Sequence, residues 1–162
     1  MTSDLLNRDH LIGLAESLLA ASEADETEVV LMTGEDYLTR FAKNRIHQNV
    51  GSLSVSVTIR AVTGKRIGVA QAESLDEATL RRTLALSQEI AALCPPIEDF
   101  KRLPKPGKIR PVEAFDEATA RTSPAQRAEI VAALVAAAKR RRAEAAGLAQ
   151  TQAGAIVVAN SH

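Results

Sequence analysis

The chain has 162 residues, enough for one domain with a substantial core, and 46% of them are hydrophobic. Aromatic side chains make up only 2%, so we expect a core of aliphatic residues. Twenty basic side chains balance twenty acidic ones, which argues against a general attraction to nucleic acid or to an acidic membrane surface.

The single cysteine, Cys94, excludes an intrachain disulfide and suits a reducing compartment. The sequence shows neither a signal-peptide pattern nor an apolar run long enough to span a membrane. We therefore expect a soluble protein of the cytoplasm with no membrane partner.

Apolar residues at three- and four-residue spacing predict an amphipathic helix over residues 9–21. A short β-branched strand is expected at 28–32, followed by a turn at Thr33-Gly34. The next strand, 37–42, ends at Lys43-Asn44, where we predict a tight hairpin because Asn tolerates the left-handed backbone.

After Gly51, apolar and polar residues alternate strictly from Leu53 to Ile59, the mark of a half-buried strand that we expect to run to Val62. Thr63-Gly64-Lys65 predicts a second hairpin, which returns the chain through Ile67 and Val69. We therefore expect at least four strands, mostly antiparallel and in meander order.

Ser74-Leu75-Asp76-Glu77 matches a capping box and predicts a second helix, which ends at Pro95-Pro96. The segment 95–111 holds five of the six prolines together with several basic residues. This composition predicts a solvated, extended connection between two lobes, 1–94 and 112–162.

In the second lobe, Asp116-Glu117-Ala118 predicts a short helical turn. Ser123, Pro124 and Gln126 mark the start of a longer helix that runs to about Ala143. We expect this helix to pack through its apolar stripe, Ile130, Leu134 and Ala137.

Two short extended pieces, 148–152 and 155–159, follow that helix and are joined at Ala153-Gly154. The predicted fold is therefore α+β: a mostly antiparallel sheet covered by amphipathic helices. Because each lobe has a helix followed by two extended pieces, the lobes resemble two αββ units, a pattern that chance can also produce.

The sequence offers no catalytic or metal site. The three histidines, His10, His47 and His162, are far apart, and none belongs to a helical zinc-peptidase motif. Cys94 has no CxxC partner and is expected to pack as a small hydrophobe. No glycine-rich loop connects a strand to a helix, so the phosphate-binding fingerprints are absent too.

Arg45, His47 and Gln48 follow the first predicted hairpin, and we consider them candidates for contact with a peptide or a partner subunit. The alternative is that they form the polar outer face of the sheet, as we expect for Arg40 and Arg60. Similarly, the basic run 139–142 could bind nucleic acid, or it could complement the negative end of a helix dipole.

The segment RFAKNRIHQN at residues 40–49 resembles the TldD/PmbA family, also called modulators of DNA gyrase. The order of the surrounding segments agrees with this resemblance over essentially the whole chain. These segments are ADETEV at 24–29, VSV at 55–57, GKRIGVA at 64–70, LDE at 75–77, SPAQRAE at 123–129 and VANS at 158–161.

This resemblance implies the N-terminal domain of a cytoplasmic, dimeric zinc metallopeptidase that trims unfolded peptides and is implicated in microcin maturation and antitoxin degradation. In that family, the HExxxH motif and a cysteine ligand lie in a C-terminal half that is absent from this sequence, and some members lack the metal motif. None of His10, His47 and Cys94 matches those ligands, so zinc is implied only for the missing half.

The resulting hypothesis is a non-catalytic N-terminal domain that builds the dimer and shapes the cavity for the peptide. Its expected partners are its own C-terminal half or a TldD/PmbA-type subunit, in a homo- or heterodimer, and an unfolded peptide. One alternative is a stand-alone module that binds a partner protein. Another, less favoured one is a regulator that binds nucleic acid.

Overall fold

The computed structural model describes residues 4–105 and 107–162 and divides into two compact units. The first unit holds the described residues of Met1–Thr33, Ser54–Pro111 and Gly154–His162. The second unit holds Gly34–Leu53 and Val112–Ala153. Each unit therefore combines segments that are far apart in the sequence.

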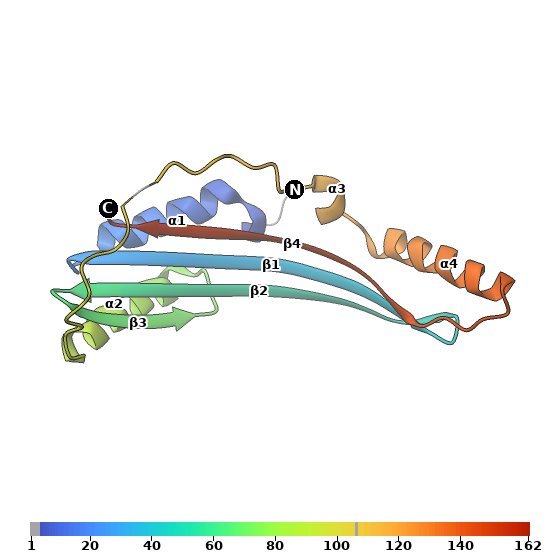
Figure 1. Cartoon of the computed structure of the whole chain (residues 1–162), viewed down its shortest axis with the longest axis horizontal. Helices are drawn as coiled ribbons and strands as arrows, with labels where there is room; N and C mark the ends of the chain where they lie inside the picture. Colours follow the sequence, from blue (N-terminus) through green and yellow to red (C-terminus); the bar gives the residue numbers. More distant parts are fainter. Residues whose placement is uncertain (1–3, 106) are drawn as a thin grey trace. The chain divides into compact units, whose positions relative to one another are not determined.

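Four strands form one antiparallel sheet in the order β3-β2-β1-β4 (Figure 1). Their bounds are β1 Glu26–Ala42, β2 Arg45–Thr63, β3 Arg66–Ala72 and β4 Gly147–Asn160. The first three strands form the expected meander, and β4 returns beside β1. Together with the helices, this sheet confirms the predicted α+β class.

A short 3-10 helix, η1, precedes four α-helices. The helices span η1 Asp4–Leu6, α1 Arg8–Ala21, α2 Glu77–Leu93, α3 Glu117–Ala120 and α4 Pro124–Arg140. The helical turn predicted at 116–118 is α3. The capping box predicted at Ser123 is present, with Gln126 at helix position N3. Among the described residues, no helix has the length and apolar character needed to cross a bilayer.

Three strands are longer than we expected. The turn predicted at Thr33-Gly34 and the two strands around it are one strand, β1, because the alternation of buried and exposed side chains continues through this point. Likewise, β2 begins at Arg45 and passes through Gly51. The two pieces predicted at 148–152 and 155–159 are a single strand, β4, so the second lobe has no αββ unit.

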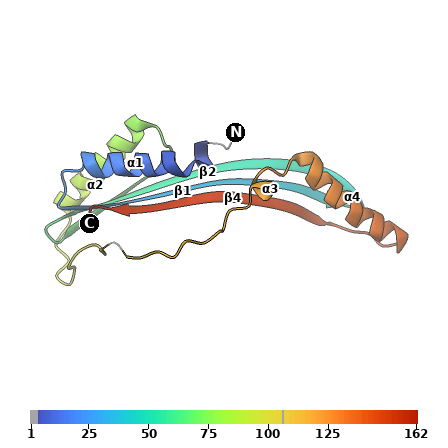
Figure 2. The same cartoon turned by 90° about the horizontal axis from the view of Figure 1, so that it is seen from above.

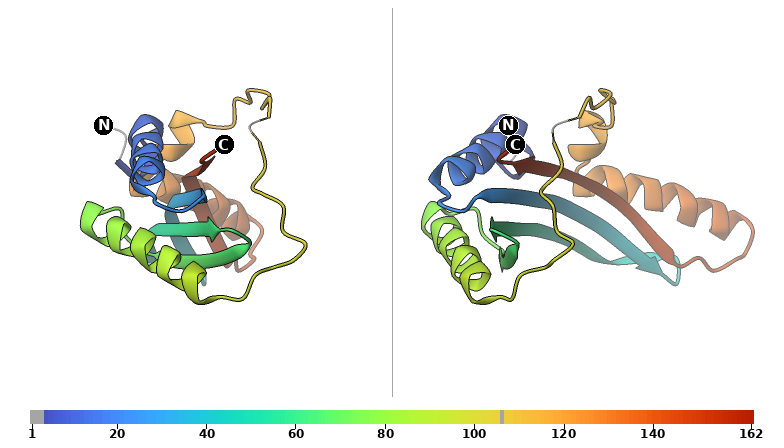
Figure 3. Two further views of the ribbon diagram at one scale, coloured as in Figure 1. Left: turned by 90° about the vertical axis from the view of Figure 1, so that its left-hand side faces the viewer. Right: turned by 60° about the vertical axis from the view of Figure 1, so that its left-hand side comes forward.

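In the first unit, α1 and α2 cover one face of the sheet, and the connection after α2 runs along the other face (Figures 2 and 3). The core lies under the helices, where Leu11, Ala15 and Leu18 of α1 pack near Val29 and Leu31 of β1. The predicted amphipathic face of α1 is thus confirmed. Burial of these aliphatic side chains supplies the main driving force for this unit.

The N-terminus of α2 differs from the capping box that we predicted at Ser74. Asp76 is the N-cap, and its Oδ1 accepts the N–H of Thr79 over 2.9 Å. Ser74 instead supports the cap, with its Oγ donating to Asp76 Oδ2 over 2.6 Å. These bonds to the carboxylate lower the pKa of Asp76 to about 2.

In the second unit, α4 presents a different face from the one that we predicted. It buries Arg127, Val131 and Val135, and the two valines pack with Phe41 of β1. Ile130 and Leu134 are exposed instead. The helix also ends at Arg140 rather than near Ala143. Because alanines fill much of the rest of α4, the helix has two apolar stripes. The stripe that contains Val131 and Val135, rather than the one with the larger Ile130 and Leu134, faces the sheet.

The segment 95–111 has no regular secondary structure in its described part, and Pro106 lies outside the described residues. This segment is less solvated than we expected, because Leu103 is buried and its N–H donates to Glu26 Oε2 over 2.6 Å. Asn160 Nδ2 also donates to the carbonyl oxygen of Pro104 over 3.0 Å. The connection is therefore attached to the start of β1 and to the end of β4.

Candidate functional site

The hairpin between β1 and β2 begins the segment in which we predicted partner contacts. Lys43 and Asn44 have φ values of 51° and 56°, so both adopt the left-handed conformation of a two-residue turn. Asn44 Nδ2 donates to the carbonyl oxygen of Ala143, and Asn44 Oδ1 accepts the N–H of Ala145. These bonds hold the turn against the segment that leads into β4.

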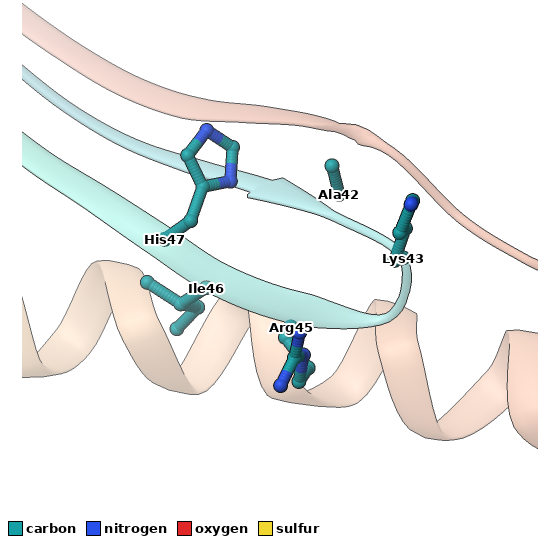
Figure 4. A pocket seen from close by; sticks show the side chains of 5 residues that line it. All are labelled: Ala42, Lys43, Arg45, Ile46 and His47. Atoms are coloured by element: carbon teal, nitrogen blue, oxygen red, sulfur yellow. The ribbon is translucent and has the colours of Figure 1, made fainter.

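The predicted contact residues are at this hairpin and are all exposed. Arg45 and His47 line an open groove of about 360 Å³ together with Ala42, Lys43 and Ile46. Figure 4 shows these five side chains around the hairpin, with His47 directed away from Arg45. Gln48 does not line the groove; its Oε1 accepts from Arg40 Nη1 over 3.4 Å.

Strand β2 has a free edge beside this groove. Its partner β3 pairs with it only from Val57 to Thr63, where Val57 lies opposite Ala72, the last residue of β3. In the described residues, no strand or loop backbone bonds to the outer side of Arg45–Leu53. We call these nine residues the β2 edge.

The composition of the β2 edge is unusual for an unprotected strand. Its side chains are exposed on both faces, and they include the large apolar residues Ile46, Val50 and Leu53. Arg45 is its only charged residue, and it has no proline. Natural edges are usually protected by lysine, proline or short length, so this edge is suited to accept another strand.

Tyr37 of β1 shapes the middle of the β2 edge. A Cβ atom on Gly51 would lie 2.7 Å from Tyr37 Cε1, so the tyrosine ring occupies the space where a side chain would start. The guanidinium of Arg127 lies over the same ring, with its Cζ 5.3 Å from the ring centroid. The ring is thus held between α4 and the strand whose edge is free.

In the first unit, several ionisable groups lie around Glu26. His162 Nε2 lies 3.1 Å from Glu26 Oε2, close enough for an ion pair when the imidazole is protonated but without hydrogen-bond alignment. Arg102 Nε lies 3.7 Å from Glu26 Oε1. Burial raises the pKa of Glu26, but the N–H of Leu103 and the charges of His162 and Arg102 outweigh it, so the pKa lies below its ordinary value of 4.5.

This cluster does not form a catalytic triad, although it brings a glutamate, a histidine and Ser161 into one region. Ser161 Oγ accepts the N–H of Thr27 over 3.0 Å, and none of the hydrogen bonds in the described residues joins it to His162. Activation of a serine requires that the hydroxyl reach the imidazole. Glu26 therefore serves to hold the connection rather than to orient a catalytic base.

Several features that shape this site were not predicted from the sequence. Asn44 was expected only to permit the turn, whereas its side chain also binds the segment before β4. The free edge could not be found from β2 alone, because it results from the shortness of β3. The close contact between the Tyr37 ring and Gly51 could have been suspected from the sequence, because a glycine within a strand often marks a close approach of another group.

The family model described as PmbA/TldA metallopeptidase domain 1 matches residues 27–91. This part of the chain therefore resembles the first domain of PmbA/TldD metallopeptidases. The matched region begins in β1 and ends in α2, so it includes the hairpin and the whole β2 edge. No curated protein matches the chain.

Three solved structures share the fold of this chain. TldE from Thermococcus kodakarensis is 24% identical, with a TM-score of 0.78 over 95% of this chain. A putative modulator of DNA gyrase from Thermotoga maritima is 12% identical, with a TM-score of 0.75 over 93%. Another, from Bacteroides thetaiotaomicron, is 11% identical, with a TM-score of 0.67 over 94%. The chain spans only 34%, 35% and 40% of the lengths of these three proteins, respectively.

Proposed function

We propose that this chain is the non-catalytic first domain of a PmbA/TldD-type metallopeptidase that acts on unfolded peptides in the cytoplasm. In this proposal, the domain helps to form the peptide cavity and the dimer, and the catalytic zinc belongs to the part of the longer relatives that the chain does not span. The partner is that C-terminal part or a second PmbA/TldD-type subunit.

The β2 edge is the observation that carries the peptide-binding part of this proposal. An extended peptide can add to it as a further strand through backbone hydrogen bonds. Such pairing depends little on the peptide's side chains, which suits a variety of unfolded substrates. Arg45, His47 and Gln48 lie at the first end of this edge and would contact the side chains of the bound peptide.

The residues present do not fit a zinc site. Among residues 4–105 and 107–162, no group of three or more histidine, cysteine, aspartate or glutamate side chains is placed to hold a metal ion. Glu26 and His162 lie close together, but the Glu26 carboxylate accepts the N–H of Leu103 and forms an ion pair with Arg102, so it is not open to a metal ion. No step of zinc chemistry is therefore assigned to this chain.

Two adjacent proline substitutions test the peptide-binding edge. Successive backbone N–H groups along a strand point to opposite sides. Of the two variants Gln48→Pro and Asn49→Pro, one therefore removes an N–H that points toward β1. The other, the outward variant, removes an N–H that points away from the sheet. We expect the outward variant to retain its circular-dichroism spectrum and to lose affinity for a fluorescein-labelled unstructured peptide, measured by anisotropy. A folded outward variant that binds as tightly as the wild type would contradict the proposal.

A triple alanine variant of Arg45, His47 and Gln48 provides a second test, because these exposed side chains are not needed for folding. We expect it to fold and to bind the same peptide several-fold more weakly. The purified chain should also hydrolyse no peptide after incubation with zinc. Stoichiometric zinc binding together with hydrolysis would overturn the assignment as non-catalytic.

The β2 edge would equally serve a stand-alone module that binds a partner protein by strand addition. A pull-down with the purified chain separates the two functions. Capture of a C-terminal metallopeptidase part supports the leading proposal, whereas capture of an unrelated protein through the same edge supports the alternative.

A further inference from the structure

Helix α4 is apolar on two faces, and only one of them is covered. Arg127, Val131 and Val135 face the sheet. On another side, Ile130 is 53% exposed and Leu134 is 51% exposed. Ala133 and Ala137 lie beside them and are exposed as well. We call Ile130, Ala133, Leu134 and Ala137 the outer stripe.

The outer stripe is not an ordinary solvated helix face. Surface helices usually place charged and polar residues opposite their buried side. From Gln126 to Ala138, however, Glu129 is the only exposed charged residue. Two aliphatic side chains one turn apart with alanines beside them leave a surface into which a second helix can pack closely.

The charges at the border of the outer stripe indicate which helix fits. Glu129 and Arg140 are eleven positions apart in α4, and at about 100° and 1.5 Å per residue they lie on the same side of the stripe, about 16 Å apart. In the described residues, neither has an ion-pair partner. One border of the outer stripe therefore carries the negative charge of Glu129 near the start of α4 and the positive charge of Arg140 at its end.

We propose that the outer stripe binds the outer stripe of a second copy of this chain, with the two α4 helices antiparallel about a two-fold axis near Leu134. This arrangement places Glu129 of each copy next to Arg140 of the other and forms two equivalent ion pairs. A parallel pair of helices would instead place the equivalent charges on opposite sides of the interface and form neither ion pair. The inference rests on the dimerisation part of the proposed function and assigns a surface to it.

The extent of the stripe sets the expected strength of the dimer. A stable protein interface buries about 800 Å² on each partner. A stripe of two large side chains and two alanines on one helix provides only part of this area. We therefore expect the chain to associate reversibly and in a concentration-dependent way.

Sedimentation velocity over a concentration series tests the inference. Ile130→Ser and Leu134→Ser should each weaken self-association by about tenfold or more. Both residues are exposed, so the fold should persist. Leu93→Ser is the matched control, because Leu93 is 87% exposed on α2 and should leave self-association unchanged. A wild-type chain that stays monomeric at every concentration would overturn the inference.

Charge reversal distinguishes a second copy from any other occupant. Glu129→Arg and Arg140→Glu should each weaken self-association, because each creates two like-charge contacts in the symmetric dimer. The double variant E129R/R140E restores both ion pairs with their signs exchanged and should recover the wild-type association. A double variant that is as weak as the single variants would contradict the antiparallel arrangement.

Peptide anisotropy on the same variants separates this inference from the proposed peptide site. If Leu134→Ser abolishes self-association and the wild-type chain binds peptide, both stand. If the wild-type chain binds peptide but does not self-associate, the outer stripe is not a dimer interface. If it self-associates through α4 but binds no peptide, the stripe stands and the peptide-binding part of the proposed function fails.

Discussion

Asn44 and Ala145 bind each other in both directions. The N–H of Asn44 donates to the carbonyl oxygen of Ala145 over 3.2 Å, and the N–H of Ala145 donates to Asn44 Oδ1 over 2.9 Å. With a further bond from Asn44 Nδ2 to the carbonyl oxygen of Ala143, one turn residue holds the approach to β4. The hairpin that begins the β2 edge is thereby fixed at its tip.

Replacing Asn44 should separate its two roles in the turn. Asn44→Gly keeps the left-handed backbone but removes both side-chain bonds, each worth about 0.5–1.5 kcal/mol. Lys43→Gly is the matched control, since it changes the neighbouring left-handed residue, whose side chain is exposed. By urea unfolding, we expect Asn44→Gly to be less stable than Lys43→Gly by about 1–3 kcal/mol. Equal stabilities would show that Asn44 serves only the turn.

Gly68 of β3 marks a close approach of strand and helix. A Cβ atom there would lie 2.0 Å from the carbonyl oxygen of Ser87 and 2.3 Å from the nitrogen of Ala91, both in α2. Because both neighbours are backbone atoms, Gly68→Ala must displace the helix, and we expect a loss of about 3 kcal/mol or failure to fold.

The exposed Gly13 provides the control for Gly68. It lies inside α1 with no atom within 4 Å of an added Cβ, so Gly13→Ala should stabilise by up to about 1 kcal/mol through helix propensity. The two alanine substitutions should therefore shift the melting temperature in opposite directions. A Gly68→Ala variant as stable as Gly13→Ala would mean that α2 can move away without cost.

Local rules in the sequence were sufficient for several turns and helix ends. The hairpins at Lys43-Asn44 and Gly64, the proline stop after α2 and the capping box at Ser123 each depend on a few adjacent residues, and all are present. Strand length was less predictable. Thr33-Gly34 has the composition of a turn, but cross-strand pairing on both sides of β1 keeps it extended.

The face that a helix buries depends on partners that the sequence does not reveal. In α4, the stripe with Ile130 and Leu134 has larger side chains than the stripe with Val131 and Val135, and hydrophobicity alone favours it. Arg127 belongs to the buried stripe because its guanidinium lies over the Tyr37 ring and donates a hydrogen bond to the carbonyl oxygen of Thr122. For the candidate site, Arg45, His47 and Gln48 were predicted from position alone, and their role in binding stays a prediction.

Glu26 makes the attachment of the connection sensitive to acid. Since its pKa in the folded chain lies below the ordinary value of 4.5, the carboxylate stabilises the attachment above that pH. This contribution is lost as the pH falls through the folded-state pKa. We expect the protection of the Leu103 amide from hydrogen exchange, corrected for intrinsic rate, to decrease in that range.

Glu26→Gln should remove this pH dependence. It should also lower the protection of the Leu103 amide by about tenfold or more at neutral pH, because a hydrogen bond to a charged acceptor contributes about 1.5–3 kcal/mol. Glu98→Gln is the control, because Glu98 lies on the same connection and forms an exposed ion pair with Lys65. A Glu26→Gln variant with wild-type protection would show that burial of Leu103 alone holds the connection.

Arg127 is a buried cation, and in the described part of the chain no carboxylate pairs with it. It is 1% exposed, and its Nη1 donates to the carbonyl oxygen of Thr122 over 2.7 Å and to Thr151 Oγ1 over 3.2 Å, whereas its Nε has no partner. Its planar group also lies over the Tyr37 ring. A lysine cannot reproduce this arrangement, because its ammonium is compact and more strongly hydrated.

We therefore expect Arg127→Lys to destabilise the chain by about 2 kcal/mol or more in chemical unfolding, since it leaves a buried charge with fewer partners. Arg140→Lys, an exposed substitution in the same helix, should stay within about 0.5 kcal/mol of the wild type. Arg127→Met, which fills similar space without a charge, should be less harmful than lysine. If lysine is tolerated as well as methionine, the guanidinium is not what anchors α4 over Tyr37.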